Sequence, residues 1–171
     1  MAARVVRERT RRRHRSRGEQ RRAPRRRVRP VQVIVCDTGP LVAAALSKDP
    51  DHHRCVELFT GLHLAQREMI IPSPVIAEVG YLLATKASPH VEAGFLESLA
   101  NEDFHVEELK VSDYSRMAEL VEQYADLPLG TTDAAVLTVT ERLNIQELAT
   151  LDLRHFNVVR PKHVKALTLL P

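Results

Sequence analysis

The chain has 171 residues, of which 44% are hydrophobic and 27% charged, and its formal net charge at pH 7 is +3. This length and composition fit one globular domain with a sizeable core, and no apolar run approaches the roughly 20 residues that a membrane helix needs. The two cysteines, Cys36 and Cys55, lack the spacing of a zinc site, and no secretory signal is visible, so we expect free thiols in the cytoplasm.

The first predicted segment is a basic arm. Residues 1–30 carry 14 arginines and two glutamates, so residues 31–171 carry 11 of the 25 Lys and Arg but 20 of the 22 Asp and Glu. We predict a disordered arm over residues 1–30, which has too few apolar residues to fold alone, and an acidic folded domain over residues 31–171. The arm could bind nucleic-acid phosphates by charge. It could also be a solvated tail, or an upstream extension from a misassigned start codon.

Short strands alternate with helices after Pro30. The apolar run Val33–Cys36 is typical of a buried parallel strand. Further strands are predicted over residues 68–72, 104–109, 147–151 and 166–170. Helices are predicted over residues 39–46, 51–64, 73–87, 89–100, 112–124 and 131–143. This alternation predicts a three-layer α/β/α sandwich with a mainly parallel central sheet.

Three helices carry more detailed predictions. Ser73 should cap the helix that follows the second strand, with Pro74 at its first position. Val56 should lie on the buried face of the helix over residues 51–64. Tyr114 should lie on the apolar face of the helix that starts at Ser112.

Four acids occupy the ends of predicted elements. Asp37 follows the first strand, and Asp152 follows the strand "ELAT". Ligands of parallel sheets bind beyond the carboxyl ends of the strands, so both acids should face one crevice. Glu78 lies on or beside the core-facing stripe of its helix, and Asp133 lies in the first turn of another.

Each acid also has an ordinary structural explanation. Asp37 is a good helix N-cap, Glu78 could reach solvent from the edge of its stripe, and acids such as Asp133 favour helix N-termini. Together, four carboxylates without a cationic neighbour in sequence would repel one another strongly. Such hard oxygen ligands suit Mg²⁺ or Mn²⁺, which can activate water for phosphodiester cleavage.

The segments that carry these acids resemble a known family. "VIVCDTGPL", "SPVIAEVGYLL", "LPLGTTDAAVLTVTERL" and "ATLDLRHF" resemble PIN domains, and most closely the VapC toxins of toxin–antitoxin pairs. The resemblance covers residues 33–171. It implies a PIN-like fold, and it implies catalytic and metal-binding roles for Asp37, Glu78, Asp133 and Asp152 with Mg²⁺ (or Mn²⁺).

The resemblance also implies a function and partners. It implies a toxin ribonuclease, a hydrolase acting on the ester bonds of RNA, that is blocked by a VapB-like antitoxin and commonly forms a homodimer. The hydroxyls of Thr132 and Thr150 match positions that often support the acids. Gly39 departs from the pattern, because many relatives have Ser there.

Positive charge near the last acid offers a place for the RNA backbone. Arg154, Arg160 and Lys162 follow Asp152 and are candidate RNA-binding residues, although a solvated edge explains them equally well. Asp126 could be a fifth acid near the site, but a turn-initiating role is the more ordinary interpretation.

Two other functions compete with the ribonuclease hypothesis. A phosphatase could use Asp37 as its nucleophile, but that chemistry usually needs a second acid at position 39, where this chain has Gly39. A non-catalytic nucleic-acid-binding module could use the Arg-rich arm, and its binding would be sensitive to salt and independent of metal.

Overall fold

The computed structural model describes residues 32–171, and the predictions for residues 1–30 lie outside the described residues. One sheet of five parallel strands has the order β3-β2-β1-β4-β5. The strands are β1 (Val33–Cys36), β2 (Glu68–Pro72), β3 (His105–Glu107), β4 (Glu147–Ala149) and β5 (Thr168–Leu170). The helices are α1 (Thr38–Ala45), α2 (His52–Leu64), α3 (Ser73–Lys86), α4 (Pro89–Ala100), α5 (Val111–Gln123), α6 (Thr131–Arg142) and α7 (Leu153–Phe156).

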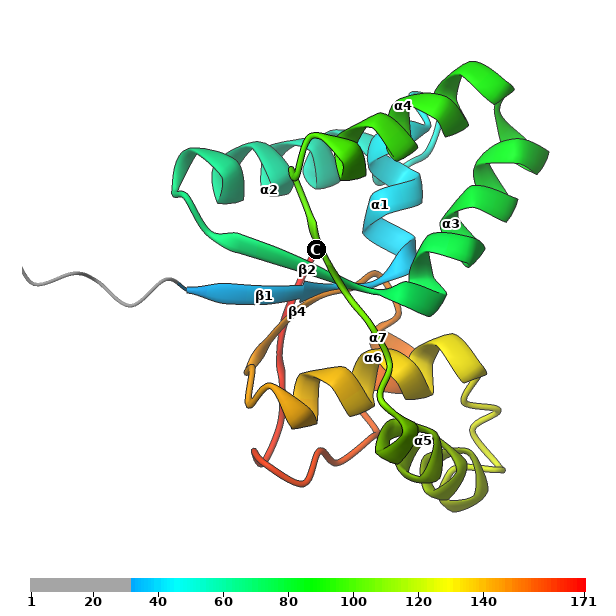
Figure 1. The fold of residues 1–171 in the computed structure, drawn as a ribbon, viewed down its shortest axis with the longest axis vertical. Helices are drawn as coiled ribbons and strands as arrows, with labels where there is room; N and C mark the ends of the chain where they lie inside the picture. The colour runs from blue at the N-terminus through cyan, green and yellow to red at the C-terminus, as the bar shows by residue number, and fades with distance from the viewer. Residues whose placement is uncertain (1–31) are drawn as a thin grey trace, which may run out of the picture.

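Helices cover both faces of the sheet. Figure 1 shows α1–α4 on one side and α5–α7 on the other, which confirms the predicted three-layer sandwich with a parallel sheet. Over residues 32–171, no helix combines the length and the apolar character that crossing a membrane requires.

The central strand and one helix are among the most completely buried elements of the core. Ile34, Val35 and Cys36 of β1 have no solvent-exposed surface, and every residue of α6 from Ala134 to Thr140 is buried. A strand that is covered on both faces has a continuous apolar sequence, as β1 does. The core therefore fixes the end of β1 and the start of α6, where two of the predicted acids lie.

The connection from β2 to α3 corrects one prediction. α3 begins at Ser73 itself, and Pro72 occupies the N-cap position without a side-chain hydrogen bond to the helix. Pro72 is also the last residue of β2, so the strand runs straight into the helix and leaves no loop residue for Ser73 to be the cap. This places Glu78 in the second turn of α3, close to the end of the strand.

The buried faces of α2 and α5 also differ from the predictions. Val56 is exposed, and Cys55 is buried in its place on α2. On α5, Tyr114 is exposed while the neighbouring Asp113 is buried. Asp113 accepts a hydrogen bond from the Arg142 guanidinium of α6, at 3.0 Å, so an ion pair sets the orientation of α5 as much as the apolar pattern does.

Candidate metal centre

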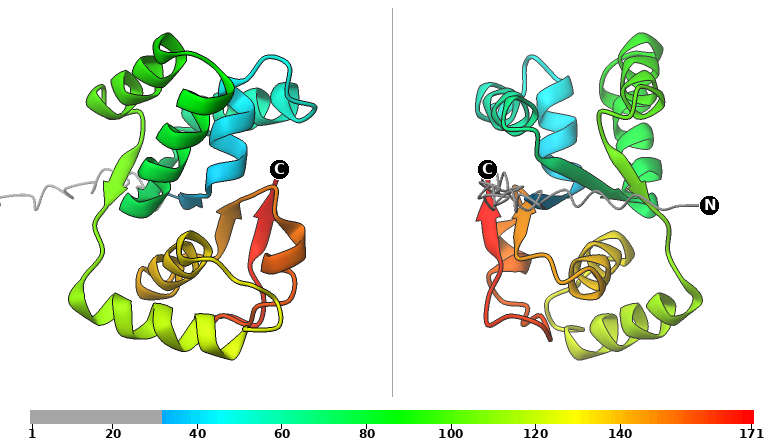
Figure 2. Two further views of the ribbon diagram at one scale, coloured as in Figure 1. Left: turned by 90° about the vertical axis from the view of Figure 1, so that its right-hand side faces the viewer. Right: turned by 60° about the vertical axis from the view of Figure 1, so that its left-hand side comes forward.

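A crevice lies where β1 and β4 end and α1, α3, α6 and α7 come close to that edge of the sheet. The left view in Figure 2 faces this side, with α1 and α3 above and α6 and α7 below. The crevice has a volume of about 550 Å³. It is lined by Asp37, Thr38, Gly39, Glu78, Asp133, Leu151, Asp152, Leu153 and Arg154. All four predicted acids therefore meet in one crevice.

Asp37 is the most deeply buried of the four acids, with 5% of its surface exposed. It caps α1, because its Oδ1 accepts a hydrogen bond from the Thr38 amide at 2.7 Å. Burial raises its pKa to about 6, against the hydrogen bonds from Thr150 and Thr38. The negative charges of Asp133 and Glu78 raise this pKa further. Asp37 is thus both the N-cap of α1 and one of the acids that line the crevice.

The hydroxyl of Thr150 joins two of the acids. Its Oγ1 donates to Asp37 Oδ2 at 2.7 Å and accepts from the backbone N–H of Asp152 at 3.0 Å. The amide can only donate, so the single hydroxyl proton is directed at Asp37. Thr150 is 1% exposed, so water does not compete for either bond. It holds the ends of β1 and β4 in register at the crevice.

Glu78 is held by a different hydroxyl. The Glu78 side chain is exposed, and its Oε2 accepts a hydrogen bond from Thr38 Oγ1 at 2.7 Å. Glu78 thus reaches solvent from the edge of the core-facing stripe of α3, and its carboxylate also lines the crevice. We refer to Asp37, Thr38 and Glu78 as the α1 side of the crevice.

Asp133 and Asp152 lie across from these residues with a histidine between them. His155 Nδ1 is 2.6 Å from Asp152 Oδ2 and 3.3 Å from Asp133 Oδ2. The Asp152 carboxylate also caps α7, because its Oδ1 accepts from the His155 amide at 2.9 Å. Burial raises the pKa of Asp133, against the Gly130 amide and His155, which lower it. We refer to Asp133, Asp152 and His155 as the α6 side.

No described Lys or Arg side chain neutralises the four acids of the crevice, and His155 is the basic group that contacts two of them. Among residues 32–171, no Lys or Arg forms an ion pair with any of the four acids. Burying carboxylates without a partner is costly unless a cation binds them. Carboxylate oxygens are the ligands that Mg²⁺ and Mn²⁺ prefer, so the residues present fit such an ion.

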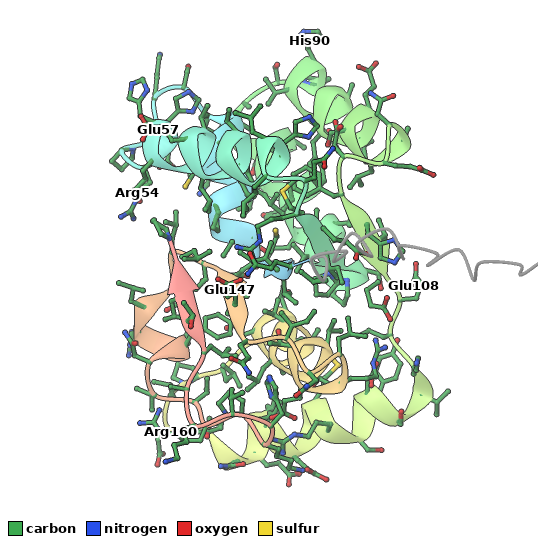
Figure 3. All side chains as sticks on the ribbon, turned by 90° about the vertical axis from the view of Figure 1, so that its left-hand side faces the viewer. Arg54, Glu57, His90, Glu108, Glu147 and Arg160 are labelled. Atoms are coloured by element: carbon green, nitrogen blue, oxygen red, sulfur yellow. The ribbon has the colours of Figure 1, made fainter. Side chains whose placement is uncertain are left out.

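The three candidate RNA-binding residues lie in different surroundings. Arg154 is exposed and lines the crevice. Arg160 donates to the backbone carbonyls of Asn157 and Val159, and Figure 3 shows it in the C-terminal loop at the lower end of the molecule. Lys162 Nζ is 3.0 Å from Glu119 Oε2 of α5. Of the three, only Arg154 lines the crevice.

Sequence reasoning missed two polar residues of the crevice. Thr38, which directly follows the strand-end acid, supports Glu78, whereas the predicted Thr132 makes no side-chain hydrogen bond within residues 32–171. His155 was not singled out from the sequence. Its position three residues after Asp152, in the first turn of a short helix, is the signal that could have identified it.

Gly39 allows a close approach at the floor of the crevice. A Cβ atom at this position would lie 3.2 Å from Leu151 Cβ, which is tighter than an ordinary contact. The glycine therefore lets the first turn of α1 approach the segment between Thr150 and Asp152, and a serine there would have to displace Leu151.

The chain is similar to known proteins over most of its length. The model of the PIN domain family matches residues 34–161. Ribonuclease VapC26 of Mycobacterium tuberculosis is 29% identical over 139 residues, which are 81% of this chain and 100% of that protein.

Solved structures share the fold at low sequence identity. The Mycobacterium tuberculosis toxin VapC20, described as cleaving the sarcin-ricin loop, has a TM-score of 0.66 and 16% identity, and the match covers 77% of this chain and 98% of that one. VapBC2 of Rickettsia felis, bound to promoter DNA, has a TM-score of 0.60, 19% identity, and coverage of 82% and 100%. FitAcB of Neisseria gonorrhoeae has a TM-score of 0.54, 13% identity, and coverage of 81% and 96%.

Proposed function

The chain belongs to the PIN domain family, and from that premise we propose that it is a divalent-metal-dependent endoribonuclease and the toxin of a VapBC-type toxin–antitoxin pair. The observation that carries this proposal is the convergence of four carboxylates on one crevice without a Lys or Arg partner among residues 32–171. The similarity to ribonuclease VapC26 supports the choice of RNA as substrate.

In this proposal, Asp37, Glu78, Asp133 and Asp152 hold Mg²⁺ or Mn²⁺. A divalent ion bound there would activate water and neutralise charge on the reacting phosphodiester. The protein's own contribution is to fix the ligands before substrate arrives. Thr150 and the Thr38 amide each donate a hydrogen bond to one oxygen of Asp37. The pKa of Asp37 is about 6, so this carboxyl is mostly ionised at pH 7.

Substrate binding would rely on the edge of the crevice. Arg154 lines it and forms no ion pair within residues 32–171, so its guanidinium is available to an RNA phosphate. Arg160 and Lys162 are engaged elsewhere on the surface, and we propose them only as contacts of a longer RNA.

A VapB-like antitoxin is the proposed partner. Two structural neighbours are named as the assemblies VapBC2 and FitAcB, which supports a protein partner of this kind. An Arg side chain of the antitoxin inserted among the four acids would supply the positive charge that the crevice lacks. We also propose a homodimer in the cytoplasm, and light scattering of the purified protein would test the dimer.

Cleavage of RNA by the purified protein tests this function directly. We expect cleavage with Mn²⁺ or Mg²⁺, none in the presence of a chelator, and at least about a thousandfold loss in Asp37→Asn, since metal catalysis supplies several kcal/mol. Metal-independent, salt-sensitive binding without cleavage would favour the nucleic-acid-binding alternative.

Expression in bacteria tests the toxin role. The chain produced alone should arrest growth, and co-expression of its cognate antitoxin should relieve the arrest. Asp37→Asn should be harmless without the antitoxin. Growth arrest by this variant as strong as that by the parent chain would assign toxicity to binding or to the basic arm.

The proposed domain division places the whole activity in residues 31–171. A chain that starts at Val31 should fold and cleave RNA with the same metal requirement, because the family match begins at residue 34. Failure of this shortened chain to fold would show that residues 1–30 belong to the domain.

A further inference from the structure

His155 has the position of a metal ligand on the α6 side of the crevice. Its Nδ1 lies 2.6 Å from Asp152 Oδ2 and 3.3 Å from Asp133 Oδ2. Neighbouring ligands of an octahedral ion at about 2.1 Å are about 3 Å from one another. One ligand atom from each of these three residues lies within 4.8 Å of the other two, which is close enough for the three to share one metal ion.

The orientation of the ring agrees with that position. Both ring nitrogens are shielded from solvent, and neither makes an aligned hydrogen bond with a described residue. Nδ1 is close to two carboxylate oxygens, yet it forms a hydrogen bond of ordinary geometry with neither of them. Ligands that share an ion have this relation, because each directs its lone pair at the ion and not at the adjacent ligand.

The backbone holds the imidazole in place. The His155 amide donates to Asp152 Oδ1, so the same carboxylate that contacts the ring also starts the helix that carries it. The His155 side chain is 15% exposed, against 35% for Asp152. A largely buried imidazole in a set of carboxylates changes which ion the set prefers.

From this geometry we propose that His155 is a nitrogen ligand of the metal centre and makes it prefer Mn²⁺ to Mg²⁺. The inference rests on the proposed function, because it assumes that the crevice binds a divalent ion. Mg²⁺ is bound almost entirely through oxygen, whereas transition metals accept imidazole nitrogen. With oxygen ligands alone, the centre would discriminate less between the two ions.

Pulsed electron paramagnetic resonance of the full chain loaded with Mn²⁺ tests this proposal. We expect a ¹⁴N coupling that changes to ¹⁵N in protein labelled with ¹⁵N-histidine and is absent in His155→Ala. His90→Ala is the matched control, since His90 is exposed on α4 (Figure 3), and this variant should keep the coupling. The labelled parent chain shows whether a histidine binds the ion even if His155→Ala does not fold. Loss of that coupling in Asp133→Asn places the histidine on the α6 side.

Binding measurements give a second, independent readout. Titration with Mn²⁺ and competition with Mg²⁺ should show that His155→Ala binds Mn²⁺ at least about tenfold more weakly, with a smaller change for Mg²⁺. Mn²⁺ bound without a nitrogen coupling, at a site that Asp133→Asn weakens, would overturn the ligand role and leave the ribonuclease proposal standing. Equal or tighter Mn²⁺ binding by His155→Ala would also overturn it. Absence of any Mn²⁺ binding that depends on Asp133 would overturn both proposals.

Discussion

The two sides of the crevice hold their acids in different ways. On the α1 side, Asp37 and Glu78 are held by neutral donors, the hydroxyls of Thr150 and Thr38 and one backbone amide. On the α6 side, an imidazole lies between the two carboxylates, and the Asp133 and Asp152 side chains are 20% and 35% exposed.

This difference determines where a bound cation matters most. A hydroxyl orients a carboxylate but leaves its charge in place, and Asp37 is 5% exposed, so water cannot screen that charge well. Asp133 and Asp152 are more exposed to solvent than Asp37 and have an imidazole nitrogen close by. The α1 side should therefore govern the stability of the metal-free protein, while both sides should be necessary for catalysis.

The largest expected effect is the loss of cleavage when either side loses an acid. Asp37→Asn and Asp133→Asn should each lower the cleavage rate at least about a thousandfold, because each removes a ligand of the same proposed ion. Asp126→Asn, an exposed acid in the turn between α5 and α6, is the control and should keep the parent rate. Full activity of Asp133→Asn would restrict the catalytic site to the α1 side.

The next effect concerns the hydroxyl that joins the two sides. Thr150→Val keeps the shape of the side chain but removes its bonds to Asp37 Oδ2 and to the Asp152 amide. We expect a drop in cleavage of about 10- to 100-fold, and a loss of about 1–3 kcal/mol in the free energy of unfolding at pH 7.

A matched control separates the site effect from a general one. Thr140→Val also removes a buried hydroxyl, but Thr140 Oγ1 donates within α6 to the Val136 carbonyl. This variant should keep the parent cleavage rate. If both variants lose cleavage equally, then Thr150 acts through packing and not by orienting Asp37.

A smaller effect is expected in the stability of the metal-free protein. Burial raises the pKa of Asp37 from its ordinary 3.8 to about 6, so the folded chain binds this proton more tightly than the unfolded chain. The resulting stability is fully present below pH 3.8 and is lost as pH rises through about 6. Between pH 7 and pH 5, the free energy of unfolding should therefore gain about 1–2 kcal/mol from this group.

Comparison with Asp37→Asn isolates that contribution from other titrating groups. In the presence of a chelator, the variant should be more stable than the parent at pH 7, and the difference should shrink toward pH 5. Urea unfolding at both pH values measures it. Excess Mn²⁺ should stabilise the parent and not the variant, since only the parent keeps the complete ligand set. If the parent chain without metal is more stable than Asp37→Asn at pH 7, then the buried charge of Asp37 does not destabilise the metal-free protein.

Sequence patterns predicted the elements that position the site because those elements have strong local signals. The run Val33–Cys36 is apolar throughout and is followed by an acid, and α6 has the apolar run AAVL directly after Asp133, so both boundaries can be predicted from composition. The faces of α2 and α5 were less predictable. Asp113 is buried by an ion pair with a residue 29 positions away, which local periodicity does not contain.

The partners of the acids were the least predictable part of the site. Thr150 reaches Asp37 across 113 residues, and the resemblance to a family, not the local pattern, suggested a supporting role for it. The same reasoning suggested Thr132 and overlooked Thr38. Which hydroxyl meets which carboxylate depends on side-chain rotamers and on how neighbouring strands end, and a sequence gives neither.

The smallest expected effect is at Thr38. It tests whether the hydroxyl of Thr150 matters more than that of Thr38 because the carboxylate it contacts is buried. Thr38→Val removes the 2.7 Å bond to Glu78 but leaves an exposed carboxylate that water can solvate, so the cost should be about 0.5–1.5 kcal/mol. Cleavage should fall only a few fold, because Glu78 keeps its place on α3 and loses only one restraint. Thr38→Ser retains the hydroxyl and should restore the parent rate. A loss in Thr38→Val as large as that in Thr150→Val would mean that the orientation of Glu78 limits catalysis, and the exposed acid of the α1 side would then matter as much as the buried one.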